Sequence, residues 1–173
     1  MDTLFENQYK RSKEFYREIH FYSYFGKPLL IAINILLVLV FAFGILSSLQ
    51  ILNHPIGSNK EFFIIFPVFI WVVTIARYIR GVRAQYRQDI ETNNGESSVI
   101  KLVFTNDGID AIRNETEAKT HIPYDKIKKV VNTKHYSMLV TEAKQYIALK
   151  KDSFVVGTLN EYYAFLESRG FKH

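Results

Sequence analysis

The sequence predicts an α+β membrane protein, in which a hairpin of two transmembrane helices precedes a small antiparallel β half-barrel capped by a C-terminal helix. Three observations lead to this prediction. Residues 29–52 and 62–79 are long apolar stretches, and the first contains no charged side chain. Residues 99–149 alternate between apolar and polar positions, with turn signals between the runs, as β-strands do. Residues 158–168 then follow a helical period.

The first apolar stretch, residues 29–52, is long enough to cross a membrane. Its 24 residues make a helix of about 36 Å, against a hydrocarbon core of about 30 Å. A cleaved signal peptide has a shorter apolar region of about 7–15 residues and a small-residue cleavage site, and no Ala-x-Ala follows this stretch. Within it, Asn34 is expected to form an interhelical hydrogen bond or to snorkel toward the interface, rather than to line a transport path.

Residues 1–28 are predicted to form an N-terminal amphipathic helix, because apolar and charged side chains fall on opposite arcs of a helical wheel. The apolar arc consists of Phe5, Tyr9, Phe15, Tyr16, Ile19 and Tyr22. Two placements stay open: the helix lies on the bilayer surface with its aromatic rings among the headgroups, or it packs on the protein's own soluble domain. Gly26, Lys27 and Pro28 are expected to end it before the first crossing.

Residues 53–61, NHPIGSNKE, are rich in turn formers and predict an external turn between two antiparallel helices. The second crossing is expected over residues 62–79, which carry no charge before Arg77. Pro67 is tolerated there because it lies near the start of the helix.

Lysine and arginine residues flank the two crossings unevenly, which predicts that both termini are cytoplasmic. The leading segment carries five of these residues, whereas the turn carries only Lys60. After the second crossing, a basic helical linker over residues 80–95 is predicted to end at Asn93-Asn94-Gly95. The arginines of this linker form one stripe with Arg77 at the end of the second crossing. We expect this stripe either to contact anionic lipid headgroups or only to set topology. It consists of Arg77, Arg80, Arg83 and Arg87.

Residues 96–173 are predicted to form the soluble β domain. Asn106-Asp107-Gly108 is a strong hairpin signal between strands at 99–105 and 109–113. Further extended segments are expected at 120–122, 127–133, 136–141 and 145–149, with a turn at 123–126. Thr158 and Glu161 form a capping box that opens the closing helix, which runs to about Ser168.

Five or six short antiparallel strands closed by one helix is the order of a pleckstrin-homology-like half-barrel. With the membrane hairpin ahead of it, and with the segments IPYDKIKKVV at 122–131 and YIALKKDSF at 146–154, the chain resembles the YcxB-like family of bacterial membrane proteins. The resemblance implies two membrane helices followed by a cytoplasmic domain similar to bacterial pleckstrin-homology modules. The family carries no established activity, so the resemblance implies no catalytic residues.

The sequence predicts no catalytic, cofactor or metal site. There is no cysteine, no glycine-rich phosphate loop and no GxSxG motif. Glu115, Glu117 and His121 suggest at most a solvated charged loop rather than an acid–base cluster. The five histidines fall in different predicted elements without metal-ligand spacing: His20, His54, His121, His135 and His173.

The net charge of +5 is expected for a membrane protein with segments retained in the cytoplasm. Lys128 and Lys129 face opposite sides of a strand, so no nucleic-acid surface is predicted. The sequence therefore predicts a membrane-anchored, non-catalytic binding or scaffold module at the cytoplasmic face of a bacterial inner membrane. Its partners would be the bilayer, with anionic headgroups, and an unknown protein or a second copy. The alternatives are an oligomeric small transport or channel subunit and an enzyme.

Overall fold

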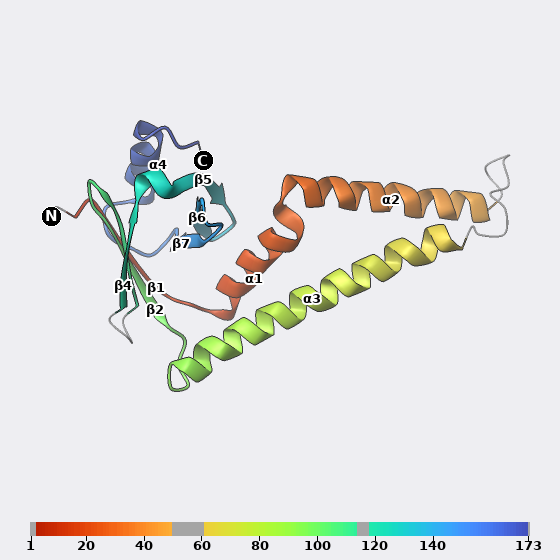
Figure 1. The fold of residues 1–173 in the computed structure, drawn as a ribbon, viewed down its shortest axis with the longest axis horizontal. Coiled ribbons are helices and arrows are strands. Elements are labelled where there is room, and N and C mark those ends of the chain that lie inside the picture. The colour runs from red at the N-terminus through yellow and green to blue at the C-terminus, as the bar shows by residue number, and fades with distance from the viewer. Residues whose placement is uncertain (1–2, 50–60, 114–117, 173) are drawn as a thin grey trace. The chain divides into compact units, whose positions relative to one another are not determined.

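The computed structural model describes residues 3–49, 61–113 and 118–172, which belong to two compact units. The helical unit comprises residues 19–84, and the β unit comprises residues 1–18 and 85–173. The chain therefore starts in the β unit, forms the helical unit and then returns to the β unit (Figure 1).

The helical unit follows the sequence prediction closely. Helix α1 (Lys13–Phe21) passes into a π-helical turn (Tyr22–Gly26), and Lys27 is extended with φ −79° and ψ 138°. Helix α2 (Pro28–Ser48) starts with its proline in the first turn, where the missing N–H costs nothing. Helix α3 (Phe62–Thr92) begins at the predicted residue and continues without a break through the predicted linker. The predicted turn at 53–61 lies outside the described residues except for Glu61.

Helices α2 and α3 run antiparallel (Figure 1) and approach each other closely at Gly44. A Cβ atom added to Gly44 would lie 3.0 Å from the backbone of Phe63 and 2.9 Å from the side chain of Ile64, so glycine permits this approach. Farther along, the rings of Phe41 and Trp71 are in edge contact with centroids 5.8 Å apart.

The outer surfaces of this hairpin are apolar and exposed. Among the described residues of α2, only Leu37 and Gly44 are buried, whereas Leu36 and Leu39 are about 60% exposed. Helix α3 likewise exposes Ile65 at 65%. Both helices are long and apolar enough to cross a membrane.

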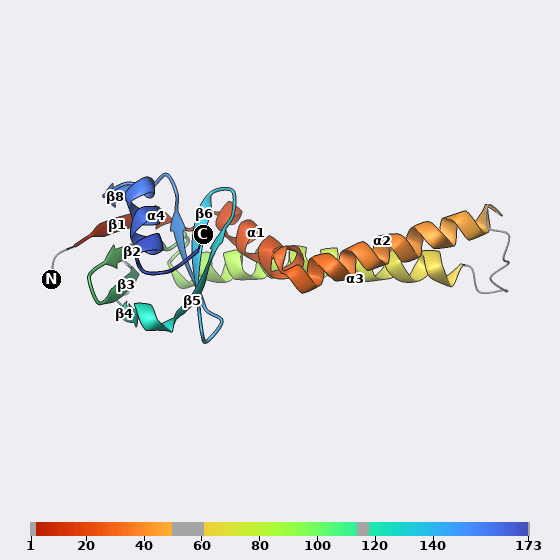
Figure 2. The ribbon, with the colours of Figure 1, turned by 90° about the horizontal axis from the view of Figure 1, so that it is seen from above.

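The β unit contains two antiparallel sheets. The larger sheet has the order β4-β3-β2-β1-β8, and Figure 2 shows these strands in succession. The smaller sheet has the order β5-β6-β7. The strands are β1 (Phe5–Lys10), β2 (Val99–Phe104), β3 (Gly108–Arg113), β4 (Ala118–Pro123), β5 (Ile127–Asn132), β6 (Tyr136–Thr141), β7 (Tyr146–Lys150) and β8 (Phe154–Val156).

The prediction of one helix across residues 1–28 is wrong at its start, because residues 5–10 form strand β1. Phe5, Asn7 and Tyr9 point inward and are buried, while Gln8 and Lys10 are exposed. A spacing of four residues between Phe5 and Tyr9 fits both one face of a helix and one face of a strand. Because Asn7, the inward-facing residue between them, is polar, the sequence does not show the alternation of apolar and polar residues that is typical of a strand. The soluble domain predicted for residues 96–173 is correspondingly incomplete, since β1 pairs with both β2 and β8.

The second half of the predicted helix does form, as α1, and its apolar side packs within the β unit. Phe15 and Tyr16 are each 5% exposed. The ring of Phe15 contacts Tyr9 at 5.8 Å and Tyr136 at 5.4 Å between centroids. Of the two placements left open by the sequence, packing on the protein's own domain is therefore the one found for these residues.

Helix α4 (Leu159–Ser168) closes one end of the β unit. Its predicted capping box is confirmed: the Glu161 N–H donates to the Thr158 hydroxyl, and the Glu161 carboxylate accepts from the Thr158 N–H at 2.8 Å. Tyr162 and Leu166 are fully buried. The ring of Tyr162 lies against Phe104 with centroids 5.6 Å apart.

Candidate functional site

The inner face of the larger sheet is made of rows of side chains that cross neighbouring strands. The row beneath α4 is large and apolar: Phe5, Phe104, Ile109 and Ile122. The two rows farther from α4 have short side chains at three of their four positions on β3 and β4, namely Ala111, Ala118 and Thr120, and the fourth position is Arg113. Short side chains at these positions cannot fill the space that long ones fill under α4.

A hollow of about 420 Å³ lies over these small side chains. Strand β7, through Tyr146 to Ala148, and the preceding residue Gln145 also line it. Tyr9, Phe15 and Ile147 supply apolar wall, and Thr120 and Gln145 supply polar groups. The hollow is therefore an inter-sheet cavity that combines apolar surface with a few polar groups, as ligand sites do.

Two arginines, Arg11 and Arg113, line this hollow. Both also line a neighbouring hollow of about 330 Å³ near the C-terminal end of α3, so they stand where the two spaces meet. The Nε atom of Arg11 is buried and has no hydrogen-bond partner among the described residues. Its guanidinium lies over the ring of Phe15, 5.3 Å from the centroid. Arg113 forms no ion pair within the described part of the chain.

Asp89, the carboxylate that lines the second hollow, is already bound by other groups. Ser98 donates to it twice, from its hydroxyl at 2.6 Å and from its backbone N–H at 3.0 Å. The Asn93 side chain donates to it at 3.2 Å. These donors fix the end of α3, and neither arginine lies within ion-pair distance of Asp89 in the described residues.

The tyrosines beside Arg11 are neutral at physiological pH. Burial raises the pKa of Tyr9, although Arg11 opposes the shift, and its hydroxyl donates to the Ala148 carbonyl at 2.7 Å. Burial also raises the pKa of Tyr16 to about 12, with Arg11 lowering and Asp89 raising it. The positive charge of Arg11 is therefore not neutralised by a phenolate.

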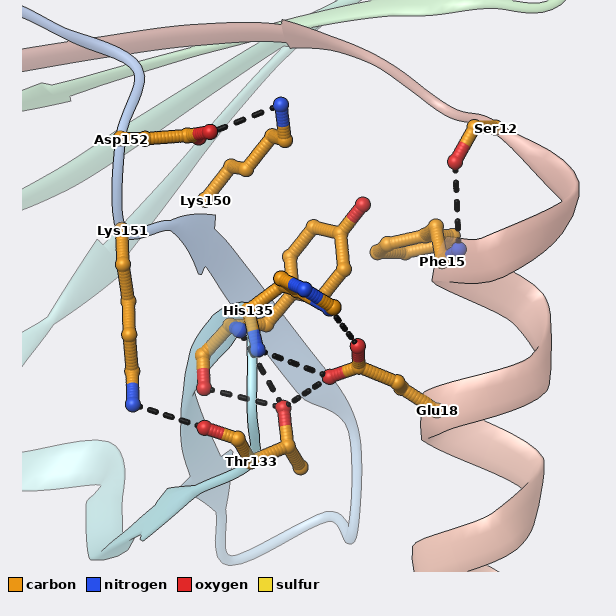
Figure 3. A network of polar contacts seen from close by, with 9 residues as sticks. Ser12, Phe15, Glu18, Thr133, His135, Lys150, Lys151 and Asp152 are labelled. Carbon is orange, nitrogen blue, oxygen red and sulfur yellow. Dashed lines mark hydrogen bonds and ion pairs between the residues drawn. The ribbon is translucent and has the colours of Figure 1, made fainter.

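A second polar cluster joins α1 to the hairpin between β5 and β6 (Figure 3). The Glu18 carboxylate accepts from the Thr133 hydroxyl at 2.6 Å and from the His135 N–H at 3.2 Å, and it also contacts the His135 ring. Lys151 donates to the Thr133 carbonyl at 2.7 Å. Burial alone raises the pKa of Glu18, but the bonds from Thr133 and His135 outweigh it and leave that pKa below its usual range. This cluster, which we call the latch, holds α1 against the hairpin, and both carboxylate oxygens of Glu18 are engaged.

The arginines predicted to contact headgroups all lie on α3 and are exposed: Arg77, Arg80, Arg83 and Arg87. Arg87 forms an ion pair with Glu91 at 2.6 Å. The first three form no ion pair within the described residues. The role predicted for them stays a prediction.

Other polar residues singled out in the sequence have structural partners. Asn34 donates to the Leu30 carbonyl at 2.8 Å and accepts from the Trp71 indole at 3.2 Å, which is the interhelical bond predicted for it. His121 contacts Asp110 at 2.8 Å. Glu115 and Glu117 lie outside the described residues. Among the described residues, no three metal-ligating side chains come together.

Sequence reasoning missed Arg11 and Arg113 as site residues. Arg113 follows Ile109 and Ala111 at two-residue steps, so the alternation of β3 already placed it on the inner face. Arg11 lies two residues beyond Tyr9 and would have followed from the same rule, had β1 been predicted as a strand.

Two apolar helices long enough to cross a membrane, followed by two antiparallel sheets and a closing helix, define an α+β protein with an inter-sheet hollow. Residues 104–166 match the model of the YcxB-like protein family. Both segments that carried the resemblance, 122–131 and 146–154, lie inside this range, so the resemblance is confirmed there. No curated protein and no solved structure matches the chain.

Proposed function

We propose that this chain is a membrane-anchored, non-catalytic binding or scaffold module at the cytoplasmic face of a bacterial inner membrane. In this proposal α2 and α3 cross the bilayer, and the β unit acts as a pleckstrin-homology-like domain that binds a protein partner or a second copy. The observation that carries it is the exposed apolar surface of the helical unit, which in water would be unfavourable by about 25 cal/mol per Å².

The pairing of β1 with β2 supports the two-crossing topology. Because these strands form one sheet, residues 5–10 and 99–104 lie on the same side of any membrane. The chain between them must then cross an even number of times, as a two-helix hairpin does. The same pairing argues against a cleaved N-terminal signal, since cleavage after α2 would remove β1 from the sheet. The Lys and Arg excess beside the β unit supports the proposal that this side is the cytoplasm.

Cysteine labelling tests this topology, because the chain has no native cysteine. Single cysteines are placed at Ser58, between the two helices in sequence, and at Ser168 in α4. In intact spheroplasts, a membrane-impermeant maleimide should label Ser58→Cys at once and Ser168→Cys only after permeabilisation. Labelling of both from outside, or of neither, would refute the proposed crossings.

Exposed arginines on α3 support the proposal that the module also contacts anionic headgroups. Arg77, Arg80 and Arg83 lack acidic partners among the described residues, and each cation near a surface contributes about 1 kcal/mol. Replacing all three with glutamine should weaken retention of phosphatidylglycerol by the purified full chain by roughly 2–3 kcal/mol at low salt. Native mass spectrometry measures the bound lipid, with Lys128→Gln, which removes one exposed charge of the β unit, as a control. Equal retention by both variants would leave the arginines with a topological role only.

The protein partner is sought by photo-crosslinking in membranes. A photoreactive residue at Val155, 61% exposed on strand β8, samples the surface of the β unit. A discrete crosslinked species that vanishes when the probe is moved to buried Leu149 supports a bound partner or copy. The transport alternative is less well supported, because the polar groups of Asn34 are occupied by Leu30 and Trp71.

A further inference from the structure

We infer that the hollow between the two sheets binds a small organic anion, one with a phosphate or carboxylate group held by Arg11 and Arg113 and an apolar body lying over β3 and β4. The inference names a ligand class for the β unit and does not depend on membrane insertion. It therefore goes beyond the anchoring and partner binding proposed above.

The size of the hollow indicates a small ligand. Its volume of about 420 Å³ falls in the lower part of the range of about 300–1,000 Å³ found for small-molecule sites. The floor owes its depth to Ala111, Ala118 and Thr120, whereas the equivalent row under α4 is filled by aromatic and branched side chains. The sheet is thus packed solid at one end and left open at the other.

The charge of the hollow indicates an anion. Arg11 and Arg113 bring two cations to one space, and like charges in a partly desolvated site repel each other. Asp89 is held by Ser98 and Asn93, and the Tyr9 hydroxyl is committed to Ala148. An anion between the guanidinium groups would remove the repulsion.

The spacing and shape of the two guanidinium groups indicate where that anion binds. Arg11 and Arg113 both line the hollow, and neither forms an ion pair among the described residues. Arg113 lies two strands away from Tyr9, about 10 Å across the sheet, which two long side chains can bridge. Planar guanidinium groups suit the paired oxygens of a phosphate or a carboxylate.

Apolar surface around the arginines accounts for the second half of the ligand. Tyr9, Phe15 and Ile147 stand over the small floor residues. Bound inorganic phosphate alone would leave this apolar surface exposed to water, and a neutral apolar molecule would leave the arginines without an anion. A molecule that combines both parts satisfies the whole lining.

Thiol protection tests the inference on the full chain in nanodiscs of phosphatidylcholine. Thr120→Cys places a reporter in the hollow, and Ser168→Cys on α4 is the control position. The rate of labelling by neutral N-ethylmaleimide is measured with 2-naphthyl phosphate at about 1 mM, and with inorganic phosphate or 2-naphthol at the same concentration. We expect 2-naphthyl phosphate to slow labelling at Thr120→Cys by about fivefold or more, with less than about twofold for the others.

Variants separate the charge from the space. In the Thr120→Cys background, Arg11→Gln or Arg113→Gln should abolish the protection, whereas Lys128→Gln, which removes an exposed charge elsewhere, should preserve it. Ala111→Leu keeps both arginines but fills the floor, and it should abolish the protection as well. Circular dichroism identifies any variant that fails to fold. The Thr120→Cys protein itself, in which both arginines are intact, still tests the inference in that case.

Two sources can supply this chemistry, and the lipid composition distinguishes them. If labelling of Thr120→Cys is already slow in nanodiscs containing phosphatidylglycerol, the anion comes from a lipid. If only 2-naphthyl phosphate protects, the ligand is a free molecule. Either result supports the site. Absence of protection in both compositions, or equal protection by 2-naphthol, would overturn it.

Discussion

Replacing Asn7 with alanine is expected to destabilise the β unit, because this side chain substitutes for a missing strand. Asn7 is fully buried on β1. Its amide donates to the Lys150 carbonyl at 2.8 Å, and its side-chain oxygen accepts from the Lys150 N–H at 3.1 Å. Both backbone groups lie on the edge of β7 that faces away from β6, its neighbour in the described part of the smaller sheet.

The alanine variant leaves the Lys150 N–H without a partner, whereas the Lys150 carbonyl keeps the Ser153 N–H as a donor at 3.2 Å. The unpaired N–H and the lost bond to the carbonyl should together cost about 1–3 kcal/mol. Opening of β7 would then become about 5- to 150-fold more frequent. Hydrogen exchange of the peptide covering 146–150, measured by mass spectrometry on the full chain, reports this opening directly.

Gln8→Ala provides the matched control, since Gln8 is the exposed neighbour on the same strand and also loses an amide. We expect the control to change exchange of β7 by less than about threefold. Equal effects of the two variants would show that the bonds of Asn7 do not join the sheets.

The remaining predictions concern the strand, the helices and the latch. Residues 96–173 alone should be unfolded by circular dichroism, and a synthetic peptide of residues 1–18 should restore β structure; a folded fragment without the peptide would contradict the role of β1. Gly44→Leu should separate α2 from α3 and lower the melting temperature, whereas Gly44→Ala should have a smaller effect. Glu18→Gln should cost about 1–2 kcal/mol at pH 7. Because the Glu18 pKa is lowered on folding, the stabilisation is fully present above the ordinary glutamate value of about 4.3 and is lost as the pH falls from there through the lower pKa of the folded state. A constant difference in denaturant midpoint across pH would refute it.

The helical unit was predictable from the sequence because the relevant property is local. Residues 29–52 identify themselves by the absence of charge, and Pro28 marks where the helix starts. The end of α3 was predictable for the same reason: Asn94 and Gly95 adopt φ values of 54° and 92°, which few other residue types tolerate.

Elements of the β unit were predictable only where a turn or a helix cap marks them in the sequence. The hairpin at Asn106-Asp107-Gly108 and the Thr158 capping box are short-range signals, and both are confirmed. Strand β8 has three residues, and β1 is its partner in the described part of the sheet. Missing β1 therefore removed the basis for finding β8.

The hollow and the latch depend on contacts that the sequence does not encode locally. Glu18 meets His135 across 117 residues, and no spacing rule brings such residues together. Arg113 could be placed on an inner face by alternation. That it shares a cavity with Arg11 requires knowing that β1 and β3 flank β2.

The place of β1 inside the larger sheet determines the order in which the protein can be made. This strand leaves the ribosome before the other strands of its sheet, because β2 and β8 follow only after both apolar helices. At about 5–20 residues per second, residues 5–10 wait roughly 10–30 s for their last neighbour. A chain whose synthesis stops before Val156 cannot complete its sheet, and its unpaired β1 edge remains open to proteases. Translation thus delays completion of the β unit until the hairpin has been made, and only full-length chains gain a protected fold.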